Sequence, residues 1–195
     1  MSKETRVFSI ELRADDQSAD SRRVVGYAAK FNSKSEDMGF YEIIEPGAFD
    51  DVMNDDVRAL FNHDPNYILA RTKSGTLTLS VDETGLRYAF DVPETTFGND
   101  FLVSLRLGNV SQSSFAFEVA EDEWTQHNTA DGKSEWTRKI KKMKRLYDVS
   151  PVTYPAYPDT EVALRSMPGY VQEPVVDTEN PWAEFMAAAT EFHTH

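Results

Sequence analysis

The stretch that decides the fold is Val110-Ser-Gln-Ser-Ser-Phe-Ala-Phe-Glu-Val-Ala-Glu-Asp-Glu123. Its two phenylalanines, Phe115 and Phe117, are two residues apart, which places both rings on one face of an extended strand. A turn-forming segment over residues 128–134 follows, and Trp136–Val149 then returns with strand character. The pattern predicts a long antiparallel hairpin with one buried, aromatic face.

Six further segments on the N-terminal side of this hairpin have strand patterns. They are Thr5–Arg13, Arg22–Phe31, Tyr41–Ile44, Val57–Asn62, Thr76–Val81 and Leu86–Val92. Asp82-Glu-Thr-Gly85 predicts a hairpin turn between the last two of these strands. Asp64-Pro-Asn66 predicts a turn directly after His63, which would stand at the end of its strand.

Helices are expected at three places in the chain. Glu45–Met53 predicts a short helix with Pro46 near its first turn, where a proline loses no needed hydrogen bond. A helix ending at Leu107 has apolar residues at helical spacing and a threonine at its N-terminal cap, Thr95 or Thr96. Pro181–Phe192 predicts a short amphipathic helix.

The fold class predicted from these elements is mainly β with a few flanking helices. Strands outnumber helices, and the regular strand–helix alternation of parallel sheets is missing from the sequence pattern. We therefore expect an antiparallel, closed or nearly closed β-barrel over residues 1–168. Residues 169–195 are predicted to form an acidic linker, Tyr170–Asn180, followed by the short C-terminal helix.

Composition narrows the classes of function. The chain has 195 residues and no cysteine, which excludes disulfides, thiolate catalysis and cysteine-ligated zinc. Its net charge of −13 argues against a nucleic acid as the default partner. No apolar run approaches the ~20 residues of a membrane span, and the N-terminus has no signal-peptide pattern. We expect a soluble, intracellular protein without a membrane partner.

One basic run, Arg138–Arg145, departs from the acidic balance. Ile140 and Met143 interrupt its charges, as in a strand with one solvated face. A nucleic-acid patch is the alternative, which the charge of the whole chain disfavours. The run could also hold an acidic protein partner or the acidic tail of this chain.

A serine nucleophile is the main chemical possibility left to a chain without cysteine. Ser111, Ser113 and Ser114 are the candidates on the long strand. Ser111 and Ser113 share the aromatic face, which should be buried, whereas Ser114 and Ala116 share the other. Ser114 should then be outward and reachable, which favours it as nucleophile. The alternative is that it is simply an outward polar residue.

His63 and Asp148 could complete a catalytic group with Ser114. His63 is the one histidine in a segment with a folded pattern, although it could equally serve to stabilise a turn. Asp148 lies between Tyr147 and Val149, so it should be partly buried and need a partner. A histidine N–H, Arg145 or a backbone amide would each serve.

Several motifs in order resemble one known family, the prohead (capsid-maturation) serine proteases of tailed bacteriophages. The resemblance covers about residues 24–164 and rests on the following pieces. They are Gly26-Tyr-Ala28 with Phe31, Glu45-Pro-Gly-Ala-Phe49, Phe61-Asn-His-Asp64, Gly75-Thr-Leu77, Gly85-Leu-Arg87, Ser114-Phe-Ala-Phe117, Asp148-Val-Ser150 and Pro155-Ala-Tyr-Pro158.

The resemblance implies a fold similar to the herpesvirus assembly proteases. It assigns the nucleophile to Ser114, the histidine to His63 and the acid to Asp148. Gln112-Ser113 stands where the family often has Gly-Met, Ala116 replaces a glycine, and aspartate replaces the more usual glutamate. We expect backbone amides of the loop Val152–Asp159 to serve as oxyanion donors.

The resemblance also implies partners and place of action. The expected substrates are the major capsid protein or a scaffold protein, and related enzymes trim themselves. Action inside the immature prohead, in the host cytoplasm, and a possible homodimer would follow. No cofactor, metal or nucleic acid is expected.

Three other functions compete with this prediction. The first is a catalytically inactive β-barrel that acts as a scaffold or as a capsid-assembly binding module. The second is an esterase, but the chain lacks the Gly-x-Ser-x-Gly elbow of that class. The third is a metal-dependent hydrolase, which His63 disfavours because no second histidine stands at ligand spacing.

Overall fold

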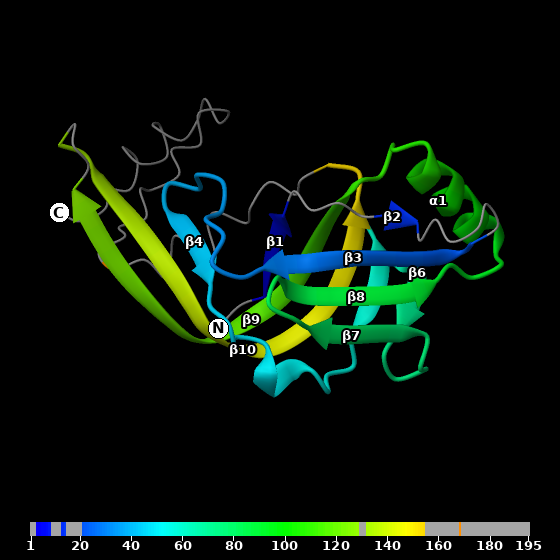
Figure 1. The fold of residues 1–195 in the computed structure, drawn as a ribbon, viewed down its shortest axis with the longest axis horizontal. Coiled ribbons are helices and arrows are strands. Elements are labelled where there is room, and N and C mark those ends of the chain that lie inside the picture. Colours follow the sequence, from blue (N-terminus) through cyan, green and yellow to red (C-terminus); the bar gives the residue numbers. More distant parts are fainter. Residues whose placement is uncertain (1–2, 9–12, 15–20, 129–131, 155–167, 169–195) are drawn as a thin grey trace, which may run out of the picture.

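The computed structural model describes residues 3–8, 13–14, 21–128, 132–154 and 168, which form two sheets (Figure 1). Sheet A has the strand order β1-β9-β10-β5-β6, and β4 also pairs with β10. Sheet B has the order β2-β3-β8-β7. The strands are β1 Glu4–Phe8, β2 Arg13–Ala14, β3 Arg23–Lys30, β4 Tyr41–Ile44, β5 Arg58–Phe61, β6 Asp64–Arg71, β7 Leu77–Val81, β8 Gly85–Asp91, β9 Gln112–Asn128 and β10 Ser134–Val152.

The predicted long hairpin is the framework of sheet A. β9 and β10 pair antiparallel from Ser134 opposite Asn128 to Val152 opposite Gln112. The register shifts at several points between Ile140 and Asp148, and such irregularities bend a strand and increase its twist. The outer part of the hairpin therefore diverges from the body of the molecule, with β4 beside it (Figure 1).

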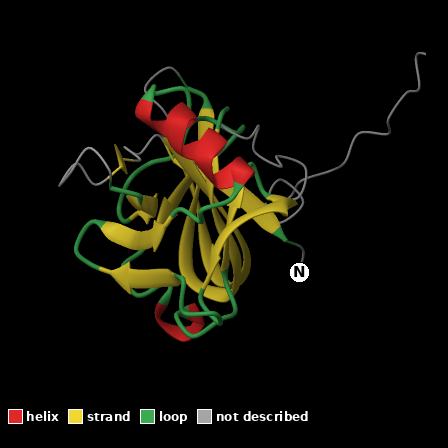
Figure 2. Ribbon diagram, turned by 90° about the vertical axis from the view of Figure 1, so that its right-hand side faces the viewer, coloured by secondary structure: helices red, strands yellow, loops and turns green. Residues whose placement is uncertain are grey.

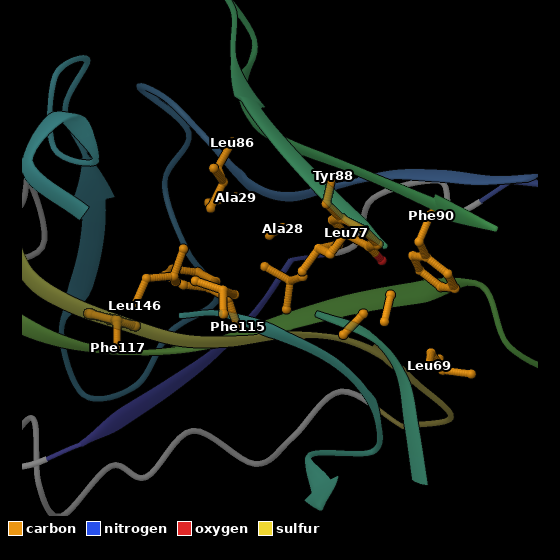
Figure 3. Close-up of a cluster of buried hydrophobic side chains, with 14 of the residues drawn as sticks. Ala28, Ala29, Leu69, Leu77, Leu86, Tyr88, Phe90, Phe115, Phe117 and Leu146 are labelled. Carbon is orange, nitrogen blue, oxygen red and sulfur yellow. The ribbon is translucent and has the colours of Figure 1, made fainter. Parts of the chain in front are cut away.

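The main core lies between the two sheets, as the two-layer rule for β proteins requires. Phe115 and Phe117 of β9 are fully buried there and stack at a centroid distance of 4.7 Å. Across from them lie Leu86 and Tyr88 of β8, and the two layers meet in Figure 3. The aromatic face predicted for the long strand is thus confirmed as the core face.

Helix α1, Thr96–Arg106, lies at one end of the sheets and the short 3₁₀ helix η1, Asp50–Val52, at the other (Figure 2). The hydroxyl of Thr95 accepts a hydrogen bond from the Gly98 N–H, which makes Thr95 the N-cap. Gly108 has a φ of 76° just after the helix, as a C-terminal glycine cap requires. In the described residues no helix is long and apolar enough to cross a membrane.

The prediction of a mainly β fold is confirmed, but the barrel prediction holds only in part. Sheet A is a curled half-barrel that stays open, and sheet B is small. The sheet is also mixed rather than antiparallel, because β4 and β5 both run parallel to β10. Both strands are separated from β10 by a long stretch of sequence, and alternation along single strands does not reveal such pairings.

Two local predictions were wrong. Residues 46–53 form turns and one short 3₁₀ segment instead of a continuous helix. The predicted turn at Asp64-Pro-Asn66 is the start of β6, and the reversal occurs one step earlier, at Asn62 and His63. The prediction for Glu45–Met53 failed because the segment is held by tertiary contacts, including a hydrogen bond from the Met143 N–H to the Ala48 carbonyl. The predicted C-terminal linker and helix, within 169–195, lie outside the described residues.

Candidate active site

His63 stands on the two-residue turn that joins β5 and β6. Asn62 and His63 both have positive φ, 54° and 59°, the combination that a type I′ hairpin turn needs. This region costs a residue other than glycine about 1–2 kcal/mol, so the surroundings must impose it. The Asn62 N–H donates to the Pro151 carbonyl, and the Thr153 N–H donates to Asn62 Oδ1 at 2.9 Å. Asn62 therefore fastens the turn to the end of β10.

Ser114 and Asp148 occupy a diagonal on the face of the β9–β10 hairpin. Ser114 lies directly opposite Ser150, and Asp148 lies directly opposite Ala116. Such diagonal positions are about 7–8 Å apart, too far for direct contact between short side chains. The imidazole of His63 bridges this gap, and the small side chains of the other diagonal, Ala116 and Ser150, leave room for its ring.

The three predicted residues form one continuous chain of contacts. His63 Nδ1 is 2.5 Å from Asp148 Oδ1, and His63 Nε2 is 2.6 Å from Ser114 Oγ. Because the carboxylate can only accept, His63 Nδ1–H donates to Asp148. The Ser114 hydroxyl proton then has two acceptors within reach, the neutral Nε2 at 2.6 Å and the Arg6 carbonyl oxygen at 2.8 Å. This is the arrangement in which an imidazole can take a proton from a serine hydroxyl while a carboxylate stabilises the imidazolium.

Asp148 is held as a buried carboxylate. Its side chain is 3% exposed, and burial by itself raises the pKa of the carboxyl. Hydrogen bonds from His63 and Ser150, with the charges of His63 and Lys3, outweigh burial and lower the pKa of Asp148 below its ordinary value. Lys3, just before β1, has its Nζ 3.5 Å from Asp148 Oδ2. The acid is thus kept ionised at neutral pH.

Strand alternation correctly predicted the sides to which Ser113 and Ser114 point, but the exposure expected for Ser114 was wrong. Ser113 points into the core, where its hydroxyl is 2.7 Å from that of Tyr88, and burial raises the pKa of that phenol. Ser114 points to the opposite face as expected, yet it is fully buried. β1 pairs with β9 at this point, and the Ser114 hydroxyl also lies 2.8 Å from the Arg6 carbonyl oxygen. Packing by β1 and His63 was not visible in the local pattern.

Sequence reasoning missed three residues that support the triad. Asn62 holds the turn, Lys3 approaches the acid, and Ser150 donates to Asp148 Oδ1 at 2.8 Å. A signal for Ser150 was present, because it follows Asp148 by two residues and so shares its strand face. Lys3 gave no such signal, since its proximity to Asp148 depends on the pairing of β1.

The loop Val152–Asp159, expected to supply oxyanion donors, lies beyond the described residues from 155 onward.

The basic run on β10 contains a buried member. Arg138 is 2% exposed, and it joins Glu4, Arg6 and Glu42 in a buried group that we call the ion cluster. Arg6 contacts Glu4 at 2.6 Å and Glu42 at 2.8 Å, and Arg138 contacts Glu4 at 2.7 Å. The cluster ties β1 and β4 to the hairpin.

The four lysines of the run lie on its outer side, each within 4.0 Å of a carboxylate of the same chain. Lys141 pairs with Glu123, and Lys144 lies 3.0 Å from Glu118 across the hairpin. The expected solvated face is therefore confirmed. Within the described ranges, no group of three or more histidine, aspartate or glutamate residues is arranged to hold a metal ion.

A buried carboxylate, an imidazole and a hydroxyl in hydrogen-bonded order are the parts that serine hydrolases use, here on a β framework. The family model of the caudovirus prohead serine proteases matches residues 8–172. The chain therefore belongs to that family of phage capsid-maturation hydrolases. A search of the curated proteins and a search of the solved structures found no significant match.

Proposed function

We propose that this chain is a serine endopeptidase that cleaves capsid or scaffold protein, and itself, during maturation of the phage prohead. Ser114 is the nucleophile, His63 the general base and acid, and Asp148 the orienting carboxylate. The observation that carries the proposal is the unbroken path Asp148–His63–Ser114, with contacts of 2.5 and 2.6 Å.

The chemistry proceeds in two stages. Ser114 Oγ attacks the carbonyl carbon of the scissile peptide while its proton passes to His63 Nε2. The proton then goes to the leaving amine as the C–N bond breaks, which leaves an acyl-enzyme ester on Ser114. Water, deprotonated by His63, hydrolyses the ester and restores the serine. Asp148 remains ionised throughout and stabilises the imidazolium.

The substrate assignment follows from family membership. A prohead protease acts inside the immature shell in the host cell, so the proteins available to it there are capsid and scaffold proteins. High local concentration in such a shell favours cleavage of weak sites. A homodimer, expected from the likeness to herpesvirus assembly proteases, belongs to the same proposal and is tested by sedimentation of the purified chain.

The direct test is intact-mass spectrometry of the purified chain, incubated alone and with the capsid or scaffold protein encoded beside it. We expect the wild type to cut its partner or itself, and Ser114→Ala to lose about 10⁴-fold or more in rate. Ser113→Ala is the matched control, because it removes a neighbouring buried hydroxyl from the same strand. Equal cutting by wild type and Ser114→Ala would remove Ser114 from the proposal.

The competing function is a catalytically inactive binding module for capsid assembly. The full burial of Ser114 favours it, since a nucleophile must meet its substrate. It predicts that wild type and Ser114→Ala leave every partner uncut, while both still co-sediment with capsid or scaffold protein. Cleavage by the wild type alone would exclude it.

A further inference from the structure

Ser150 has an unusual position for a buried strand serine. It is fully buried on β10, directly opposite Ser114 and two residues after Asp148. Its hydroxyl donates to Asp148 Oδ1 at 2.8 Å, the same carboxylate oxygen that receives the N–H of His63. The candidate acid thus has two donors on one oxygen, one from the base and one from its own strand.

This geometry restricts the rotation of the carboxylate. An aspartate side chain can turn about its terminal torsion over a broad range, so a single contact leaves its direction loosely defined. His63 and Ser150 both donate to Oδ1, and Lys3 faces Oδ2 at 3.5 Å. With Ser150 in place, Oδ1 is directed at His63 Nδ1 before any substrate arrives.

We propose that Ser150 is a positioning residue of the active site, which aims the Asp148 carboxylate at His63 and thereby holds the imidazole over Ser114. The inference rests on the proposed function, because it assigns Asp148 the role of orienting acid. Ser150 itself touches no reacting atom, and its effect passes through Asp148 and His63.

A measurable electrostatic consequence accompanies this role. The Ser150 hydroxyl is one of the groups that lower the pKa of Asp148, so its removal raises that pKa. The charged groups that face Asp148 are His63 from the β5–β6 turn and Lys3 from the start of β1. Arg58, its partner on β5, is engaged by Asp56 at 3.2 Å instead.

The first readout is independent of catalysis. Long-range ¹H–¹⁵N correlation spectra of ¹⁵N-histidine-labelled full chain report the state of each imidazole nitrogen through non-exchanging ring protons. In Ser150→Ala we expect the Nδ1 signal of His63 to shift, and its response to Asp148 protonation to move to higher pH. Ser113→Ala, which removes a buried hydroxyl that bonds to Tyr88, should leave both unchanged.

The second readout is reactivity of the nucleophile. A fluorophosphonate probe labels an activated serine, and Ser114→Ala supplies the blank. We expect Ser150→Ala to lower the second-order rate of labelling about 10-fold, the loss of one hydrogen bond to a charged group. The acidic limb of its pH profile should move to higher pH. Ser150→Thr, which keeps the hydroxyl, should recover most of the rate.

The outcomes separate this inference from the proposed function. If the wild type labels and Ser150→Ala matches it in rate, pH profile and spectrum, Ser150 has no positioning role. A changed His63 spectrum in Ser150→Ala with no labelling of the wild type would keep the positioning role and reject the protease. Should the alanine variant fail to fold, Ser150→Cys fills the site with a somewhat larger side chain that is only a weak donor. An unchanged spectrum and rate in that variant would equally overturn the inference.

Discussion

Two buried polar groups share β10 and a contact with β1, and they differ in how their members are paired. In the ion cluster, Arg6 and Arg138 each contact both Glu4 and Glu42, and all four residues are at most 5% exposed. In the triad, one carboxylate faces an imidazole that is 19% exposed, and the chain of contacts continues through the Ser114 hydroxyl to the Arg6 carbonyl oxygen. Each cation of the cluster contacts carboxylates, whereas the triad contains a serine hydroxyl whose proton can move to the imidazole.

The ion cluster is a polar group whose burial stabilises the fold, whereas the triad is one whose burial serves a reaction. Charges taken out of water must be paired, and removal of one partner leaves the other uncompensated. Substitutions in the ion cluster should therefore lower stability, and substitutions in the triad should lower the reaction rate. Both groups depend on β1, which supplies Glu4 and Arg6 to one and the Arg6 carbonyl contact with Ser114 to the other.

The largest expected effect is on rate, at the acid of the triad. Asp148→Asn should lower the cleavage rate about 10⁴-fold, because an amide at this position favours the wrong tautomer of His63. The folded structure should persist, as judged by circular dichroism. Asp64→Asn, at a nearby acid whose Oδ1 accepts from the Asn66 N–H, is the control and should cleave normally. A variant at 148 that retained a tenth of the activity would show that His63 works without this carboxylate.

The next effect is on stability, in the ion cluster. Arg138→Met should lower the free energy of unfolding by about 3–5 kcal/mol, since two buried carboxylates lose a cation. Urea denaturation measures this change. Lys142→Met on the same strand removes an exposed cation 3.9 Å from Asp51 and should cost less than about 0.5 kcal/mol. Equal losses in the two variants would mean that burial of the cluster carries no special cost.

A smaller effect is expected at the turn that carries His63. Asn62→Ala should lower the free energy of unfolding by about 2–3 kcal/mol, from backbone strain at positive φ and one lost hydrogen-bond acceptor. Asn62→Gly keeps the backbone free to adopt this φ, so it should lose only the acceptor for the Thr153 N–H. The difference between the two variants, by urea denaturation, isolates the backbone strain. Identical losses would locate the effect in the side chain alone.

The smallest effect concerns pH and stability. Because the pKa of Asp148 is lowered in the folded state, its contribution to stability is complete above its ordinary pKa of 3.8. It is lost as the pH falls through the lowered value. The difference in unfolding free energy between wild type and Asp148→Asn should be constant above pH 3.8 and should shrink as the pH falls below that value. A difference that grew on acidification would reverse the assigned direction of the shift.

Local patterns predicted the elements whose stability is local. The β9–β10 hairpin, the β7–β8 hairpin and α1 each combine periodicity with their own turn or cap, so their approximate bounds could be derived. The segment 46–53 and the start of β6 could not, because contacts with other strands decide their conformation. The parallel pairing of β4 and β5 with β10, and with it the open sheet, depends on long connections that carry no periodic signal.

By itself the sequence predicted the residue types of the candidate triad, and it determined the buried face of the long strand and the side to which Ser114 points. It did so because strand alternation is a property of the covalent chain. Only the tertiary structure decided that His63 spans the diagonal between Asp148 and Ser114, and that Ser150 and Lys3 approach the acid. Those contacts join residues up to 145 positions apart, so they follow from which strands pair and in what register.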